Sequence, residues 1–528
     1  MSDDMSRGSV GGSRPIELDR RGFLRAAGGG MVALAGGGLP RSANAQGKAG
    51  GTLTFATSAL PPSIEPHMQG LDIWQKRKPL IYENLVWIDH GLEPRPELAE
   101  RWEQKSPTEY VFHLRRGVKF HNGKEVDAED VKYSYDRIRD PKVSPGANDF
   151  VYVKQIDAVD KHTVRFTLTG PAATFLINVG GKYNGVIPKD SAGDGKALLT
   201  RAVGTGPFSV EEFDPSRRLG LKRNATYWGA QKPLLDGVVF QAIPDESSIV
   251  AGLRTGQVTL AEFSSGLNFL VAKNVPLLEA VQAPSTRWVV LDLAGDQEPT
   301  SKLEVRQAIA LAIDRQAVLQ IAGSGIGQRL GVLPPGLKYW ALPWQELPNQ
   351  QRDVAKARAL LQKAGYAGRV TMKIRNIVGF AALGAALPVI VDNLKEAGID
   401  VTVETVDGGV WIKDWIVPQS PPTMNEWGGF VDPDQAFHRH FHSPPGGKDF
   451  RRWKNKQADE LLDAGRATLD RARRKQIYDQ VQRLMAEDPI TIPLYSPDLL
   501  YAMQKGLKGF QPHPTGFYYG LRFAWLAR

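Results

Sequence analysis

One stretch of the chain, residues 424–434, combines side chains suited to holding a small molecule. It reads Met-Asn-Glu-Trp-Gly-Gly-Phe-Val-Asp-Pro-Asp. Its glycine, proline and aspartate residues predict a loop, and glycine lets the backbone approach a ligand closely. The indole of Trp427 can stack on a sugar ring, an aromatic group or an aliphatic body. The candidate ligand-binding residues of this stretch are Glu426, Trp427, Gly428, Gly429, Phe430 and Asp432.

Some of these residues can instead serve the fold alone. Trp427 can equally be a core residue, and Asp432 and Asp434 can cap the helix predicted to follow them. Arg287 and Trp288 lie on a predicted strand and are further candidates for the ligand-binding site. Two other tryptophans, four residues apart on a predicted helix, are candidates for the core instead: Trp411 and Trp415.

Three histidines just after this stretch are spaced like possible metal ligands. His438, His440 and His442 alternate with other residues. On a strand all three would share one face and could bind a divalent ion. On a helix each step of two residues turns the side chain by about 200°, which separates them. The choice between the two depends on the secondary structure of this segment.

The sequence lacks the usual signatures of catalysis. It contains no G-x-S-x-G, no H-E-x-x-H and no G-x-x-x-x-G-K-[ST] motif. The glycine-rich stretch 323–327 has no predicted strand before it, so it is a weak dinucleotide signal. There is no cysteine, which excludes disulfides, thiolate metal sites and cysteine nucleophiles. We therefore predict that the chain is not an enzyme and has no cofactor.

Length and charge set further bounds. The chain has 528 residues, a hydrophobic fraction of 42% and a charged fraction of 23%, which is ordinary globular composition. This length suggests about three domains. The net charge of +9 is spread along the sequence, which argues against nucleic acid as a partner.

The N-terminus has the layout of an export signal. The paired Arg20 and Arg21 are followed by Phe23 and Leu24, and a small apolar run comes next. A small-x-small cleavage site ends at Ala45. We interpret residues 1–45 as a twin-arginine signal peptide, with the twin-arginine translocase as a transient partner and a periplasmic destination.

The region around residue 120 predicts a hairpin that leads into a helix. Tyr110–Leu114 alternates like a strand, and Val118–His121 is expected to return beside it. Asp127 and Asp130 form an acidic capping box. The helix that they open carries Val131, Tyr135 and Ile138 on its apolar face.

Helices and strands alternate in the second half of the chain, which predicts a mixed or parallel sheet. Ser301–Glu304 is expected to be a capping box for a helix whose apolar face includes Leu303. The other expected elements are helices at 355–365, 387–397 and two within 457–487, and strands at 163–168, 399–406 and 490–495.

The segment Arg115–Ser134 carries a family resemblance. Its string R-R-G-V-K-F-H-N-G-K-x-x-x-A-E-D-V-x-Y-S is similar to the signature of the family 5 extracellular solute-binding proteins. These proteins, of the dipeptide-, oligopeptide- and nickel-binding type, serve ABC importers. The resemblance extends over about residues 50–528 and includes three further blocks: 96–102, 203–208 and 305–315.

The resemblance implies an α/β fold of the two-lobed periplasmic-binding-protein type (type II), with mixed sheets flanked by helices, a hinge and an extra subdomain. It implies a helix at 81–86 and places the Gly204–Gly206 segment next to the hinge. Because the family is helical after Asp-Pro-Asp, we predict no metal at the three histidines. The implied boundaries are lobe I at 46–84, 203–297 and 496–528, the extra subdomain at 85–202 and lobe II at 298–495.

The resemblance also bears on the ligand. In peptide-binding relatives, an aspartate three positions after the tryptophan pairs with the peptide amino group, whereas this chain has Phe430 there. An ammonium enclosed without a counter-charge is unfavourable by several kcal/mol. We therefore expect a small organic solute or a modified peptide, delivered by a monomer to an ABC permease. A conventional di- or oligopeptide-binding protein and an exported enzyme or chaperone remain the alternatives.

Overall fold

The computed structural model describes residues 50–68, 72–192, 197–199, 201–378, 381–408, 410, 420–443 and 451–527. The predicted signal peptide and both Trp411 and Trp415 lie outside the described residues. Among the described residues, no helix has the length and apolar character needed to cross a membrane.

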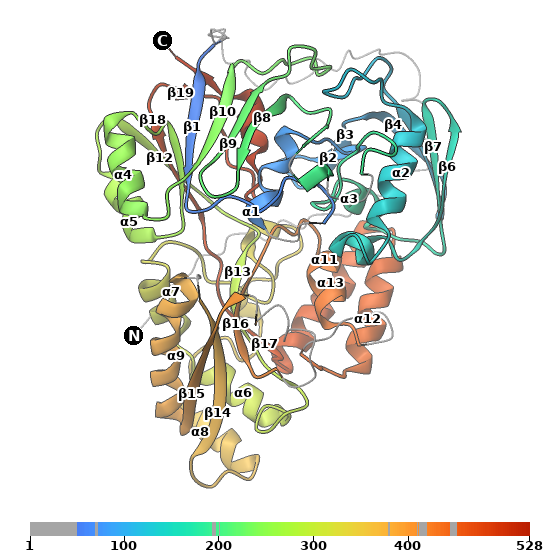
Figure 1. Ribbon diagram of the computed structural model, residues 1–528. Coiled ribbons are helices and arrows are strands. Elements are labelled where there is room, and N and C mark those ends of the chain that lie inside the picture. Colours follow the sequence, from blue (N-terminus) through green and yellow to red (C-terminus); the bar gives the residue numbers. More distant parts are fainter. Residues whose placement is uncertain are drawn as a thin grey trace, which may run out of the picture. The chain divides into compact units, whose positions relative to one another are not determined.

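A seven-stranded mixed sheet unites the beginning, middle and end of the described chain (Figure 1). Its order is β12-β18-β11-β1-β10-β9-β8. The strand β1 pairs in parallel with both β10 and β11, and the other pairs are antiparallel. Its strands are β1 (Thr52–Thr57), β8 (Phe208–Asp214), β9 (Arg218–Arg223), β10 (Gly237–Ala242), β11 (Leu260–Phe263), β12 (Leu278–Ala283) and β18 (Leu499–Gln504), and two helices pack on it, α4 (Glu246–Thr255) and α5 (Gly266–Lys273).

A second, five-stranded sheet has the order β15-β14-β16-β13-β17. Its parallel pairs involve β14, and β13 runs antiparallel to both of its neighbours. The predicted strand at 399–406 is confirmed. The strands are β13 (Trp288–Asp292), β14 (Val370–Ile377), β15 (Ile399–Val406), β16 (Thr423–Trp427) and β17 (Thr491–Tyr495), and the helices around them are α6 (Leu303–Ala312), α7 (Arg315–Ala322), α8 (Val354–Lys363) and α9 (Ala381–Ala397).

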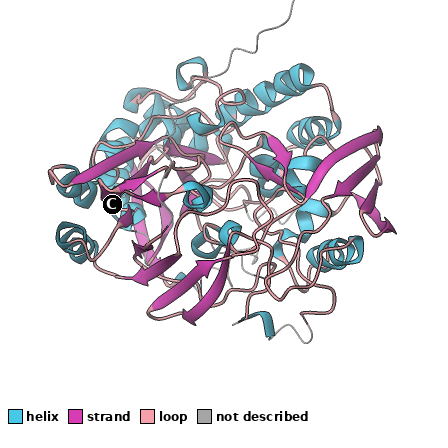
Figure 2. Ribbon diagram, turned by 90° about the horizontal axis from the view of Figure 1, so that it is seen from above, coloured by secondary structure: helices cyan, strands magenta, loops and turns pink. Residues whose placement is uncertain are grey.

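A third sheet is antiparallel and has the order β4-β5-β7-β6. Figure 2 shows its strands at the right-hand edge of the view from above. The helix α2 (Ala128–Ile138) packs on it and begins with the predicted capping box, because Asp127 accepts from the Asp130 N–H and Asp130 accepts from the Asp127 N–H. The strands are β4 (Ala99–Ser106), β5 (Glu109–Leu114), β6 (Val153–Asp160) and β7 (Thr163–Leu168).

Smaller elements complete the described chain. The helices α11, α12 and α13 pack in succession, and the last two confirm the two helices predicted within 457–487. The remaining helices are α1 (Asp72–Gln75), α3 (Phe175–Val179), α11 (Pro433–Phe441), α12 (Lys456–Ala467) and α13 (Arg471–Glu487). The short strands are β2 (Val86–Ile88), β3 (Pro94–Pro96), β19 (Leu507–Lys508) and β20 (Trp525–Leu526), and the 3-10 turns are 78–80, 145–150, 197–199, 335–337, 344–346 and 518–523.

Three local predictions are wrong. Val118–His121 makes a single isolated bridge, from Lys119 to Glu125, because β4 and β7 already occupy both edges of β5. The expected helix at 81–86 is absent, since this segment lies against the Gly204–Gly206 backbone and leads into β2. The helix α6 forms without the expected capping box: the Ser301 hydroxyl donates to Glu298, and Leu303 is exposed.

The chain passes between the first two sheets twice, from β12 to β13 and from β17 to β18. These two crossings are bonded to each other: the Ser496 hydroxyl donates to the Arg287 carbonyl at 2.7 Å, and the Ser285 hydroxyl donates to the Pro497 carbonyl. By strand pairing β13 belongs to the second sheet, although the boundary predicted at residue 297 assigns it to lobe I. The lobe boundaries stay predictions.

Gly204 and Gly206 lie elsewhere, where the chain returns from the third sheet to β8. The Gly206 N–H donates to the Ile81 carbonyl at 2.9 Å. A side-chain carbon at Gly204 would collide with that same carbonyl oxygen. These glycines are therefore needed for close backbone packing, and their place next to a hinge stays a prediction.

Candidate ligand-binding site

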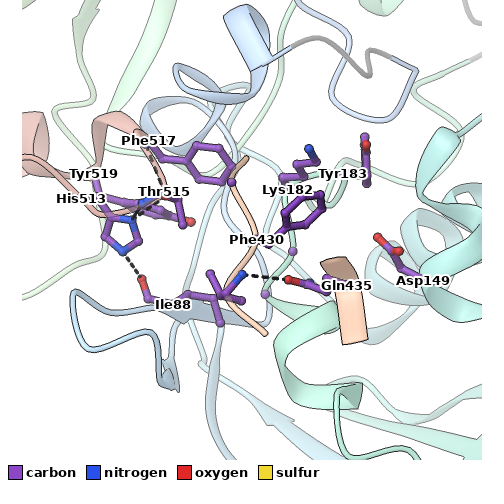
Figure 3. A pocket seen from close by; sticks show the side chains of 14 residues that line it. Ile88, Asp149, Lys182, Tyr183, Phe430, Gln435, His513, Thr515, Phe517 and Tyr519 are labelled. Atoms are coloured by element: carbon purple, nitrogen blue, oxygen red, sulfur yellow. Dashed lines mark hydrogen bonds between the residues drawn. The ribbon is translucent and has the colours of Figure 1, made fainter. Parts of the chain in front are cut away.

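A small cavity opens where three distant segments meet (Figure 3). One contains residues 180–183 after α3, the second is 429–435 at the start of α11, and the third is 513–519 near the C-terminus. The cavity volume is about 30 Å³, which is room for roughly two water molecules. An organic solute can therefore bind here only if the lining segments move apart. The lining residues are Ile88, Asp149, Gly180, Gly181, Lys182, Tyr183, Gly429, Phe430, Val431, Gln435, His513, Thr515, Phe517 and Tyr519.

Gln435 fixes the segment that enters α11. Its side-chain oxygen accepts a hydrogen bond from the Val431 N–H at 3.1 Å. Its amide nitrogen donates to the side-chain oxygen of Asn178 in α3 at 3.0 Å. Figure 3 shows the first of these bonds as the dashed line that ends at Gln435. One glutamine thus ties the loop of the second segment to the helix of the first.

His513 holds the C-terminal segment in place. Its Nε2 lies 3.1 Å from the Ile88 carbonyl and 3.0 Å from the Asp89 carbonyl, so Nε2–H is the donor. Its Nδ1 accepts from the Thr515 hydroxyl at 2.6 Å. Burial, reinforced by the nearby His90, lowers the pKa of His513 to about 4. His513 is therefore a neutral part of the framework at neutral pH.

Phe430 forms an aromatic wall of the cavity. Its ring lies 5.5 Å from that of Trp288 and 5.7 Å from that of His440, between centroids, and the side chain is buried. The Lys182 ammonium lies 5.6 Å from the Phe430 ring centroid. The cavity thus places a cation above an apolar surface at this point, and Tyr183, Phe517 and Tyr519 add further aromatic surface.

The carboxylates of residues 426–434 all face arginines. Glu426 forms an ion pair with Arg287. Asp434 accepts from Arg466 at 3.0 Å, and although burial by itself raises the pKa of Asp434, the charge of Arg466 holds it below its ordinary value. Asp432 caps α11 by accepting from the Asp434 N–H at 2.9 Å. The capping interpretation of Asp432 is therefore realised in the structure.

The other predicted site residues do not line this cavity. The stretch 424–434 is a loop only from Gly428 onward, because β16 ends at Trp427. The Trp427 indole N–H donates to Asp292 at 3.1 Å, and its half-buried ring lies 4.6 Å from that of His440. Gly428 packs against the Arg287 side chain, and Trp288 is only 2% exposed. Of the eight predicted residues, Gly429 and Phe430 line the cavity.

A larger second cavity adjoins the first. Its volume is about 340 Å³, within the range of small-molecule sites. Val431 lines both cavities, and Asp432 lines the second. Its lining includes several aromatic and basic side chains: Lys338, Tyr339, Trp340, Arg471 and Arg474.

Sequence reasoning missed several lining residues. Lys182 and Tyr183 follow two glycines, and Phe517–Tyr519 precedes Gly520. Aromatic residues beside glycine in a loop were the same signal that singled out residues 424–434, so both stretches could have been found. Gln435 gave no signal, because its role depends on the distant Asn178.

Comparisons with known proteins give the family. Residues 93–449 match the family described as bacterial extracellular solute-binding proteins, family 5 Middle. The chain belongs to this family and is a solute-binding protein with the type II periplasmic-binding-protein fold. The proteins of this family are binding proteins rather than enzymes.

Three relatives illustrate the similarity. The dipeptide-binding protein of Escherichia coli (strain K12) is 26% identical over 502 residues, which cover 88% of this chain and 93% of the relative. The solved structure of the ABC transporter-associated periplasmic binding protein DppA from Helicobacter pylori with the peptide STSA is 27% identical, with a TM-score of 0.80 and coverage of 91% and 99%. The structure of AgaA from A.tumefacien R10 with agropinic acid is 27% identical, with a TM-score of 0.81 and coverage of 90% and 99%.

Proposed function

We propose that this chain is the periplasmic solute-binding component of an ABC importer. It would close on a small organic solute and deliver it unchanged to the permease complex. The family match and the described DppA relative, which is named as ABC transporter-associated, support this role. Residues 1–45 supply the export step by the twin-arginine route, and the chain acts as a monomer.

The proposed ligand is an organic solute that lacks a free ammonium group, or a peptide whose amine is modified. The observation that carries this proposal is the environment of Phe430. Where the family resemblance implies a carboxylate, this chain has an aromatic ring with the Lys182 ammonium 5.6 Å from its centroid. A ligand ammonium at this position would meet a like charge, which is unfavourable in a site closed to water.

The neighbouring carboxylates do not restore the missing counter-charge. Glu426, Asp432 and Asp434 are each engaged by an arginine. Redirecting any of them to a ligand would leave that arginine without its partner, at a cost comparable to the gain. Asp149 and Lys182 both line the cavity, so its lining carries one formal charge of each sign.

A conventional peptide-binding function is the second candidate. It is favoured by the relatives, because one is named for dipeptides and another was solved with the peptide STSA. A third relative was solved with agropinic acid, so similar folds also hold solutes that are not peptides.

Two measurements separate the candidates. Native mass spectrometry of the protein purified from its own periplasm identifies whatever is retained in the closed form. Titration of tryptophan fluorescence, with 12 tryptophans as reporters, then compares di- and tripeptides, their N-acetylated forms, sugars, opines and polyamines. We expect saturation by a solute without a free ammonium. Saturation by free di- or tripeptides at about micromolar concentration, with no response to the other pools, would contradict the proposed ligand class and support the second candidate.

A further inference from the structure

The histidine-rich turn of α11 faces a carboxylate on α12. His438 and His442 are four residues apart, so they share one face of the helix. Their rings stack at 4.3 Å between centroids, with an interplanar angle of 12°. His440 points elsewhere, toward Trp427 and Phe430. The three histidines thus do not act as a set, but two of them converge.

Asp463 completes the cluster from the neighbouring helix. Its Oδ1 lies 3.1 Å from His438 Nε2 and 3.2 Å from His442 Nε2. The three potential ligand atoms all lie within 4.8 Å of one another. Ligands bound at about 2.0–2.1 Å around a tetrahedral zinc ion are separated by about 3.3 Å, so two of the three separations already match.

The hydrogen bonding of His442 prepares its ring for a metal. Its Nδ1 lies 2.7 Å from the Ser443 carbonyl, so Nδ1 carries the proton and Nε2 keeps its lone pair. That Nε2 atom is buried and has no hydrogen-bond partner among the described residues. A histidine that donates its second N–H to a backbone carbonyl is the usual arrangement of a metal ligand.

The charge and access of the cluster also suit a cation. Each histidine side chain is 13% exposed, whereas that of Asp463 is 64% exposed and opens the cluster to solvent. Asp459 and Asp434 lie on the same two helices, and Arg466 of α12 donates to Asp434.

We propose that His438, His442 and Asp463 bind a late first-row divalent cation of the Zn²⁺ class, with solvent completing the coordination. Two imidazoles and one carboxylate are the ligand types that zinc, nickel and copper accept, while calcium and magnesium prefer oxygen alone. The ion would fasten α11 to α12. Because α11 starts two residues after the cavity-lining Val431 and carries Gln435, the site would stabilise this wall of the ligand cavity.

The test uses the untagged mature protein with Zn²⁺ as the probe, measured by calorimetry and by the visible absorption of Co²⁺ as a substitute. We expect the parent protein to bind one Zn²⁺ per chain. The zinc affinity should be at least about tenfold weaker in each of His438→Gln, His442→Gln and Asp463→Asn. Asp463→Asn alters an exposed side chain, so it tests the site without threatening the fold. The matched control is His113→Gln, which breaks a single histidine–carboxylate pair of 3.0 Å with Glu103 and should leave zinc affinity unchanged.

The outcomes are distinct from those of the ligand experiments. Tetrahedral cobalt absorption that is lost in the three variants and kept in the control supports the site. Absence of zinc binding, or equal binding by Asp463→Asn and the parent protein, overturns it.

Discussion

Arg474 and Asp432 form a two-pronged ion pair in the interior of the protein. The guanidinium nitrogens of Arg474 donate to the two oxygens of Asp432 at 2.6 Å each. Both side chains are almost fully buried. The pair joins α13 to the first turn of α11, directly behind the loop that lines both cavities. The position and the charge of that loop therefore depend on Arg474, which lies 42 residues after Asp432 in the sequence.

Removing one partner of this ion pair should destabilise the folded protein. Arg474→Met would leave the Asp432 carboxylate buried without a counter-charge, and we expect the free energy of unfolding to fall by about 3–5 kcal/mol. The double variant Asp432→Asn, Arg474→Met removes the charge as well and should lose clearly less. Urea unfolding of both variants measures the difference. Equal losses would show that the pair is not electrostatically coupled.

Phe430→Asp should change the ligand range. The substitution introduces a carboxylate near the Lys182 ammonium, which adds a counter-charge for a ligand ammonium at this position. We expect affinity for free dipeptides to rise by at least about tenfold, which corresponds to about 1.4 kcal/mol. N-acetylated dipeptides should gain nothing, and Phe430→Asn, of nearly equal size but neutral, is the matched control. An equal gain in the asparagine variant would assign the effect to space and not to charge.

Trp427→Ala should reduce stability more than ligand affinity. The ring packs on His440, and its N–H donates to the buried Asp292. Loss of a large aromatic side chain from a largely packed position is expected to cost about 3 kcal/mol of unfolding free energy. Trp427→Phe keeps the ring packing and should recover part of the loss. If thermal unfolding is unchanged while solute affinity falls by about 1–3 kcal/mol, Trp427 contacts the ligand directly.

His513 should make the protein less stable in mild acid. Its pKa in the folded state, about 4, lies below its ordinary value of 6.5, so between these pH values only the unfolded chain takes up the proton. The contribution of His513 to the free energy of unfolding is therefore complete above pH 6.5. It declines as the pH falls toward 4, by up to about 3 kcal/mol. The buried His67, whose pKa burial lowers to about 3, acts in the same direction.

The slope of the unfolding free energy against pH tests whether His513 causes this loss of stability. Unfolding free energies of the parent protein and of His513→Gln are measured from pH 7 to pH 4.5. We expect a shallower decline for His513→Gln, whatever its stability at pH 7. Identical slopes for the two proteins would refute the assignment.

Export provides a test of the N-terminal interpretation. Replacing Arg20 and Arg21 together by lysine keeps the charge but removes the paired arginines of the predicted signal. We expect the precursor to remain in the cytoplasm, uncleaved, while the parent chain is processed near Ala45. Periplasmic recovery of the lysine variant at the parent level would exclude the twin-arginine route.

Local signals predicted the elements that depend on local contacts. The helices ending at Gly365 and Gly398 stop where these glycines adopt positive φ, and the strand Ile399–Val406 was predicted to the residue. Val118–His121 failed because a strand needs a free neighbour, which its own hairpin partner could not offer. Ser301 failed as a cap because the Glu298 carboxylate attracts its hydroxyl.

The residues of the candidate site also fall into those that local sequence signals can find and those that only the tertiary fold brings together. Gly429 and Phe430 were found from the composition of one loop, and both line the cavity. Lys182 and Phe517 lie 248 and 87 residues away in the sequence, and only the tertiary fold brings them to the same cavity as Phe430. The pairing of His438 with His442, rather than with His440, needed the helix to be known.

The bonded pair of connections at Ser285–Arg287 and Ser496–Pro497 limits how the protein can open. Two bodies joined by one strand can rotate freely about it, whereas two strands tied to each other resist torsion and leave bending as the soft motion. We therefore expect a single axis of opening. A solute should accordingly enter and leave from the side opposite these connections, and the closed form should be reached along one path.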